Sequence, residues 1–212
     1  EAILIKPDYV EAHNAMGVAL RDQGKLDKAT ASFNYALALK PNYAEPDNNM
    51  GIALKDQGEL DKAIAFFNRA ISIKSLYTEA WLNGAEILEK WNKLRELELW
   101  LEKAFDAFEI VPSDIRFMKS KLFWRNKNYK EAFYLISNID FETISENIQQ
   151  DYLTLKAKCF ERLNRYDMAY ECFAKSNFLA KRSKAYLASD PEKYFQNLKK
   201  NLENLKSNYT EK

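Results

Sequence analysis

The sequence predicts an all-α solenoid, in which antiparallel helix pairs stack one on the next, and three observations support this fold class. Glycine and proline, which disfavour helix interiors, account for only five residues each of 212. The segment GVALRDQGKLDKA, which begins at Gly17, returns almost unchanged as GIALKDQGELDKA, which begins at Gly51, 34 residues later. Two further series of mostly small residues keep the same spacing along the chain. Self-similarity at this period indicates stacked copies of one helical unit.

The two series mark the positions where the paired helices are expected to approach each other most closely. In the first helix they are Gly17, Gly51, Ala85, Ser120 and Ala157, and in the second helix Ala29, Ala63, Leu97, Ala132 and Ala169. Both series step by 34, 34, 35 and 37 residues. A larger side chain at the glycines would push the helices apart, and Phe33 and Phe67 are expected to plug the gap to the neighbouring repeat.

The predicted turns between paired helices centre on Gly24, Gly58, Asn92, Lys127 and Asn164. Glycine suits the first two turns because it accepts the positive φ that a tight helix end requires. The three later copies have lost this glycine, so we describe them as divergent.

Seven positions together resemble the tetratricopeptide repeat, namely Gly17, Leu20, Gly24, Ala29, Phe33, Ala36 and Pro41. The resemblance implies a right-handed superhelical solenoid in which the first helix of each pair lines a concave groove. It also implies five repeats, at residues 10–43, 44–77, 78–112, 113–149 and 150–189, the fourth of which holds extra residues at 141–149.

The two ends of the chain depart from the repeat. Ala2 and Pro7 stand 34 residues before Ala36 and Pro41, so we expect residues 1–9 to be the tail of a truncated preceding repeat.

Residues 190–212 begin with an Asp-Pro-Glu helix start. The apolar stripe that follows is Phe195, Leu198, Leu202 and Leu205. Two interpretations stay open for this predicted helix: a cap on the last repeat, or a connector to a following domain.

The composition excludes several function classes. A formal net charge of +1 gives no global attraction to nucleic acids or membrane surfaces. No apolar stretch approaches the roughly 18 residues of a membrane span. Cys159 and Cys172 lack the spacing of a redox or metal motif, so we expect free thiols in a reducing compartment, the cytoplasm.

Catalysis has little support in the sequence. The single histidine, His13, falls at the inward-facing fourth position of the first repeat, which favours core packing. Phosphate-loop, dinucleotide, serine-hydrolase and zinc-protease motifs are absent. The paired carboxylates Glu96 and Glu98, and Asp140 and Glu142, suit solvated helix faces. We therefore expect no catalytic residue, no cofactor and no metal ion.

The side chains expected to line the groove fall at the second, fifth, sixth, ninth, twelfth and thirteenth positions of each repeat. The second position is acidic throughout, which the dipole at a helix N-terminus also favours. Asparagine, a mediocre helix former, recurs at the fifth and sixth positions, where its amide can donate to and accept from a peptide backbone. Phe117, Met118, Lys121, Trp124 and Arg125 form an aromatic–basic patch, in which Trp124 is either a ligand platform or packed under the insertion. The predicted peptide-binding residues are Asn14, Arg21, Asn48, Asn49, Lys55, Asn83, Phe117, Lys121, Trp124 and Arg125.

Asn49 and Asn83 resemble the asparagine ladder in the repeats of O-GlcNAc transferase, with Asn14 one residue early. The carboxylate clamp of chaperone-binding members is largely absent. Where that pattern has Lys, Asn, Asn, Lys and Arg, this chain has Asn14, Val18, Asn49, Glu79 and Asn83. Recognition of a free C-terminal carboxylate is therefore disfavoured.

A second resemblance concerns Ala169, Phe173, Asn177 and Leu179, whose spacing is similar to the segment that closes the repeat region of tetratricopeptide–sulfotransferase fusion proteins. No catalytic residue carries over, because the phosphosulfate-binding loop of that family is not in this sequence. The sequence favours a protein- or peptide-binding scaffold that uses its concave face. The alternatives are the non-catalytic, substrate-recruiting arm of a sulfotransferase fusion, and self-association through exposed array ends.

Overall fold

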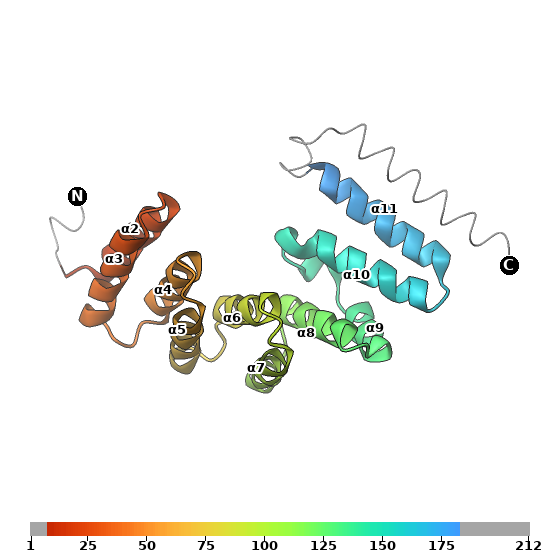
Figure 1. Ribbon diagram of the computed structural model, residues 1–212, viewed down its shortest axis with the longest axis horizontal. Coiled ribbons are helices and arrows are strands. Elements are labelled where there is room, and N and C mark those ends of the chain that lie inside the picture. The colour runs from red at the N-terminus through yellow and green to blue at the C-terminus, as the bar shows by residue number, and fades with distance from the viewer. Residues whose placement is uncertain (1–7, 183–212) are drawn as a thin grey trace. The chain divides into compact units, whose positions relative to one another are not determined.

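The computed structural model describes residues 8–182 (Figure 1). They form two compact units, an N-terminal unit that ends at Asp140 and a C-terminal unit that begins at Phe141. The predicted terminal helix at 190–212 lies outside the described residues, as does all but the end of the predicted tail at 1–9. No β-strand occurs in residues 8–182, and the prediction of an all-α fold is confirmed.

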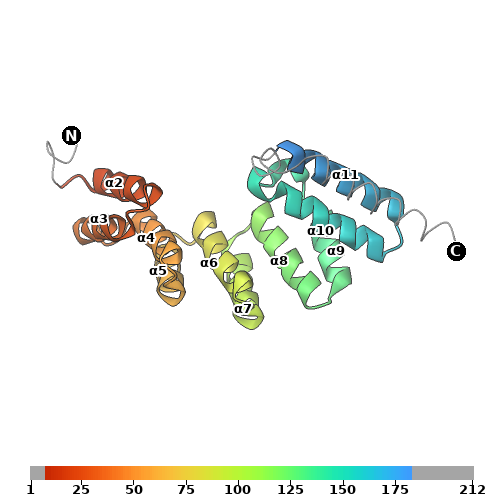
Figure 2. The same ribbon diagram turned by 45° about the horizontal axis from the view of Figure 1, so that its top comes forward.

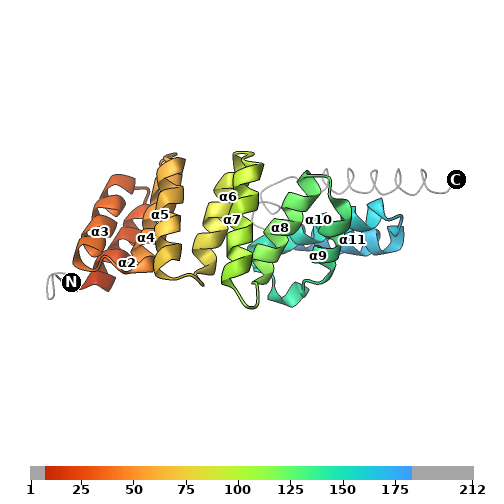
Figure 3. The ribbon, with the colours of Figure 1, turned by 90° about the horizontal axis from the view of Figure 1, so that it is seen from below.

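The N-terminal unit consists of four antiparallel helix pairs. They are α2 (Val10–Asp22) with α3 (Leu26–Leu39), α4 (Ala44–Asp56) with α5 (Leu60–Ile73), α6 (Thr78–Lys90) with α7 (Leu94–Ala107), and α8 (Ser113–Arg125) with α9 (Tyr129–Ser137). Helices α3, α5 and α7 also pack against the first helix of the next pair. Figure 3 shows these helices side by side through the unit.

The C-terminal unit begins with two short 3-10 helices, η1 (Phe141–Thr143) and η2 (Glu146–Ile148), within the predicted insertion. The fifth helix pair follows, α10 (Gln149–Arg162) and α11 (Tyr166–Arg182). Tyr152 is fully buried between these elements. Both cysteines are free, and burial raises the pKa of the Cys159 thiol to about 11.

All five first helices end in the same hydrogen-bonded turn. In the first pair, the N–H of Gly24 donates to the carbonyl of Arg21 at 2.8 Å and that of Lys25 to the carbonyl of Leu20 at 2.9 Å, which is the pattern of a Schellman cap. The residue at the predicted centre of each turn has positive φ, namely Gly24 (73°), Gly58 (82°), Asn92 (58°), Lys127 (62°) and Asn164 (58°). The predicted turn positions are confirmed in all five copies.

A close contact between a glycine and an aromatic ring sets the distance between the helices of a pair. A Cβ atom added at Gly17 would collide with the ring of Phe33, and one at Gly51 would lie 2.5 Å from the ring of Phe67. Both rings are fully buried. They fill the space within their own helix pair. From the sequence, they were expected only to fill the gap to the neighbouring repeat.

The third pair makes the same contact with its residues shifted by one position. Ala85 was predicted as the small residue at the closest approach, but the side chain that faces α6 is Trp100, and it lies against Gly84. The indole N–H of Trp100 donates to the carbonyl of Trp81 at 2.9 Å, and the two rings meet edge to face. The indole is larger than a phenyl ring, and it packs where α6 has a glycine, which leaves room for it.

Replacing Lys127 with glycine should stabilise the fold. Lys127 is exposed and has a φ of 62°, a conformation that costs an L-residue about 1–2 kcal/mol. Part of this gain is offset by the greater freedom of glycine in the unfolded chain. We expect Lys127→Gly to raise the free energy of unfolding by about 0.5–1 kcal/mol, measured by urea denaturation. Lys127→Ala is the control and should bring no gain; equal stability of the two variants would contradict the strain argument.

Candidate peptide-binding surface of the first helices

Helices α2, α4, α6 and α8 are neighbours within the N-terminal unit, since each contacts the next. Figure 2 shows them following one another. Their side chains at the predicted groove positions form what we call the first-helix face. It comprises Asn14, Arg21, Asn48, Asn49, Lys55, Asn83, Glu86, Glu89, Lys121 and Arg125.

Two asparagine pairs connect successive first helices. The amide nitrogen of Asn49 donates to the side-chain oxygen of Asn14 at 3.0 Å, and that of Asn83 donates to the side-chain oxygen of Asn48 at 3.0 Å. Each pair joins the fifth position of one repeat to the sixth position of the next. The asparagines therefore hold neighbouring helices together as well as facing outward.

The asparagine pairs correct the predicted exposure of these residues. Asn49 and Asn83 were expected to be free on the surface, but both are partly buried, and Asn48 is only 4% exposed. Each pair uses one donor and one acceptor. Among the described residues, the side-chain oxygen of Asn49, the oxygen of Asn83 and the amide N–H groups of Asn14 make no other hydrogen bond. These groups keep unused hydrogen-bonding capacity, and the bonds to the neighbouring asparagines orient them.

The polar pairs end at the third repeat. The corresponding positions in α6 and α8 are Leu82 and Met118, and Met118 is 8% exposed. Phe117, predicted to belong to an aromatic–basic patch, is only 1% exposed, so this part of the prediction is wrong. Removing large apolar side chains from water is favourable. At the fifth and sixth positions, α8 therefore buries Phe117 and Met118, where α4 has two asparagines.

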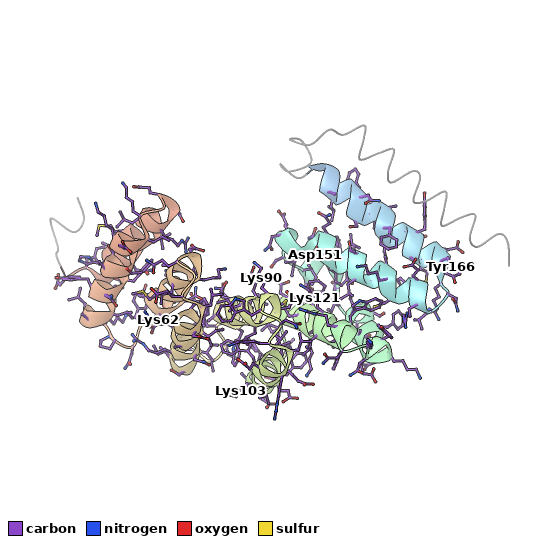
Figure 4. All side chains as sticks on the ribbon, viewed as in Figure 1. Lys62, Lys90, Lys103, Lys121, Asp151 and Tyr166 are labelled. Carbon is purple, nitrogen blue, oxygen red and sulfur yellow. The ribbon has the colours of Figure 1, made fainter. Side chains whose placement is uncertain are left out.

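Glu86 of α6 binds one cation of α4 and one of its own helix. Its carboxylate accepts hydrogen bonds from Lys55 of α4 at 3.2 Å and from Lys90 at 2.8 Å. Partial burial alone would raise the pKa of Glu86, but the hydrogen bonds and charges of Lys90 and Lys55 outweigh it and lower the pKa. Lys90 is labelled in Figure 4.

Glu89, one turn further along α6, binds two cations of α8. Its carboxylate lies 3.4 Å from Nζ of Lys121 and 3.1 Å from Nη1 of Arg125. Arg125 also donates to the backbone carbonyl of Glu89 at 3.0 Å and to the side chain of Asn92 at 2.7 Å. The predicted ligand-binding cations thus already have anionic partners, and a ligand carboxylate would compete with Glu86 and Glu89 for them.

The remaining predicted residues have local partners. Arg21 forms an ion pair with the adjacent Asp22 at 2.9 Å. Trp124 is partly buried, and its ring meets that of Tyr129 on α9 edge to face at 4.9 Å. His13 is 7% exposed with its ring 4.2 Å from that of Tyr35, as expected for a core position.

A buried carboxylate beneath this face forms an ion pair that was not predicted from the sequence. Asp47 of α4 is fully buried, and Nε of Arg69 on α5 lies 2.9 Å from Oδ1 and 3.0 Å from Oδ2, with hydrogen-bond geometry only to Oδ2. Burial raises the pKa of Asp47 to about 6, although the charge and hydrogen bond of Arg69 oppose the shift. The available signal was a carboxylate at the inward-facing fourth position, where the neighbouring repeats have His13 and Trp81.

The part of the chain that the structure describes contains no group of three or more His, Cys, Asp or Glu residues that could hold a metal ion. None of its helices has the length and apolar character needed to cross a membrane.

Family models agree with this architecture. Residues 17–58 match a model described as TPR repeat, and residues 48–75 match one described as Tetratricopeptide repeat. No curated protein matches the chain. Neither model describes a sulfotransferase fusion.

Three solved structures illustrate the likeness in fold. PilF of Pseudomonas aeruginosa superposes with a TM-score of 0.70 at 20% identity, over 88% of this chain and 83% of that chain. PilW, described as a widely conserved type IV pilus biogenesis factor, gives a TM-score of 0.64 at 22% identity, over 88% and 85%. YrrB, described as a TPR protein with an unusual peptide-binding site, gives 0.59 at 16% identity, over 88% and 94%. The chain therefore has the fold of a tetratricopeptide solenoid, with recognisable repeats of that type at residues 17–75.

Asp47 should make stability fall as pH rises. Its pKa is higher in the folded chain than the ordinary value of 3.8, so folding favours the protonated form. That contribution is present at low pH and is lost between about pH 4 and pH 6, at a cost of up to about 3 kcal/mol. Asp47→Asn should remove this cost while keeping an acceptor for Arg69.

The test is the difference in unfolding free energy between Asp47→Asn and the natural chain, measured by urea denaturation from pH 4 to pH 7. We expect the difference to grow in favour of the variant as pH rises. Asp56→Asn, an exposed residue of the same helix, controls for the substitution itself. A difference that is constant with pH would show that Asp47 titrates alike in the folded and unfolded chain.

The asparagine pairs should contribute measurably to stability. Asn49→Ala combined with Asn83→Ala removes both hydrogen bonds, each worth about 0.5–1.5 kcal/mol. Alanine also raises helix propensity, so the matched control is Asn34→Ala with Asn68→Ala, two exposed asparagines of α3 and α5. We expect the first double variant to be less stable than the control by about 1–3 kcal/mol in urea denaturation. Equal stabilities would mean that the pairs contribute nothing.

Proposed function

We propose that this chain is a protein-interaction scaffold whose first-helix face binds an extended segment of a partner protein. The observation that carries the proposal is the pair of asparagine bridges between α2, α4 and α6. They leave oriented amide groups of Asn14, Asn49 and Asn83 with unused hydrogen-bonding capacity.

The chemistry of these groups fits a peptide backbone. An extended peptide presents N–H and C=O groups in alternation along its edge, and each of them needs a partner when the peptide is removed from water. Asn49 and Asn83 can accept from peptide N–H groups, and Asn14 can donate to a carbonyl. Because each asparagine is already held by its neighbour, less side-chain entropy is lost on binding.

This mode of contact tolerates many ligand sequences, because it addresses the backbone. Lys55, Lys121 and Arg125 of the face are engaged by Glu86 and Glu89, which disfavours a ligand that depends on a free carboxylate. The peptide-binding site described for YrrB, a protein of similar fold, supports a peptide as the ligand class. No observation favours the sulfotransferase alternative. The two free thiols are compatible with a reducing compartment, and we propose the cytoplasm.

The experiment selects ligands from a displayed library of random 12-residue peptides and measures their affinities by fluorescence anisotropy. Asn49→Ala with Asn83→Ala should weaken selected peptides by about 1–3 kcal/mol, roughly 5- to 150-fold. Asn34→Ala with Asn68→Ala is the control and should leave affinity unchanged. Circular dichroism at the assay temperature establishes that each variant is folded. Selected peptides that bind both double variants equally well would contradict the proposed site, as would the absence of any peptide binding.

A further inference from the structure

The fourth repeat places a lysine where the repeats before it have apolar or small residues. Lys119 of α8 is the seventh residue of its repeat; its counterparts are Met16, Met50 and Gly84 in the earlier repeats and Lys156 in the fifth. Met16 is 41% exposed, whereas Met50 is 2% exposed and Gly84 lies directly against the ring of Trp100. A charged side chain at this position departs from what the second and third repeats bury there, and departures of this kind concentrate at functional sites.

Lys119 lies among aromatic rings. Its Nζ is 4.0 Å from the ring centroid of Phe105 on α7 and 6.0 Å from that of Phe123 on α8. Ring faces attract a cation but do not neutralise its charge. No carboxylate within the described residues forms an ion pair with Lys119, whose side chain is partly buried.

These residues line an open cavity of about 450 Å³ formed by α7, α8 and α9. Phe105, Phe123, Tyr134 and Leu135 give it apolar walls, and Tyr134 is 72% exposed. Helix α9, which supplies Lys130, Glu131, Tyr134 and Leu135 to this lining, has 9 residues, whereas α7 has 14. Figure 3 shows the three helices from below.

The charge of the cavity is positive. Lys119 and Lys130 contribute two cations, and Glu131 contributes one carboxylate. An apolar ligand alone would leave Lys119 without an anionic partner in a partly dehydrated site, which is unfavourable. A purely anionic ligand would leave the aromatic walls without contact.

We propose that this cavity docks a segment of a partner protein that presents a large apolar side chain beside a carboxylate. The apolar side chain fills the space between Phe105, Phe123 and Tyr134, and the neighbouring carboxylate pairs with Lys119. The cavity volume suits one or two side chains and is too small for a whole helix. Two of the three helices that form it are second helices, so this surface is distinct from the first-helix face.

The test selects 12-residue peptides from a displayed random library on the Asn49→Ala, Asn83→Ala variant, in which the first-helix face contributes least. We expect the selected peptides to be enriched in an aromatic or leucine residue adjacent to Asp or Glu. Their affinity, measured by fluorescence anisotropy, should fall at least tenfold with Lys119→Glu and also with Tyr134→Ala. Lys103→Glu, an exposed site on α7, is the charge-matched control and should change affinity less than twofold.

A second variant protects the test against misfolding. Lys119→Met introduces the residue that Met50 supplies in the second repeat, so the variant should fold. It should lower the affinity for acidic peptides at least fivefold. The affinity for peptides in which glutamine replaces the acid should not change. Selected peptides without acidic residues, or an affinity that Lys119→Glu leaves unchanged, would overturn the proposal. Failure of the asparagine variants in the preceding test would leave it standing, because no asparagine of that face lines the cavity.

Discussion

Each of the first three helix pairs depends on one contact, in which an aromatic ring of the second helix lies on a glycine of the first. The contacts are Phe33 on Gly17, Phe67 on Gly51 and Trp100 on Gly84. Because no side chain separates the ring from the backbone, the thickness of the ring fixes the separation of the helices. The turn geometry then fixes the direction in which the second helix leaves the first. The ring contact and the turn together give successive first helices the same orientation. The asparagines of neighbouring repeats can form hydrogen bonds because of this common orientation.

The repeat spacing of 34 to 37 residues was sufficient to predict the helix pairs, their turns and most buried positions. It identified even Lys127 and Asn164 as turn centres, because the Schellman cap depends on backbone position more than on residue type. It predicted the wrong contact in the third repeat, where the ring and the glycine each lie one position earlier than in the first two repeats. Trp100 uses Gly84 in place of Ala85, since a larger ring needs the smaller partner. A repeat alignment compares equivalent positions and cannot detect such a paired shift.

Most residues of the candidate site could be predicted from the sequence, Phe117 excepted, but the contacts between them could not. Asn49 and Asn83 were identified, yet they contact residues 35 positions earlier, one beyond the period, so equivalent positions in the alignment never meet. Glu86 and Glu89 occupy the ninth and twelfth positions of the third repeat, which the sequence analysis had named as groove positions without considering which cations lie across from them. The burial of Asp47 was not predicted, because its partner Arg69 lies on the other helix of the pair and the repeat pattern does not show that the two residues meet.

The positions of the donor and the acceptor in the asparagine pairs determine which repeat could be duplicated in tandem while keeping the hydrogen bond between repeats. Only the second repeat has asparagine at both the fifth and the sixth position, Asn48 and Asn49. The first repeat supplies only the acceptor, Asn14, and the third only the donor, Asn83, so these two terminate the series. A tandem duplicate of residues 44–77 would meet its own copy through the same hydrogen bond. The chain therefore contains a self-complementary module, and duplication of that one segment could lengthen the array without altering either of its neighbours.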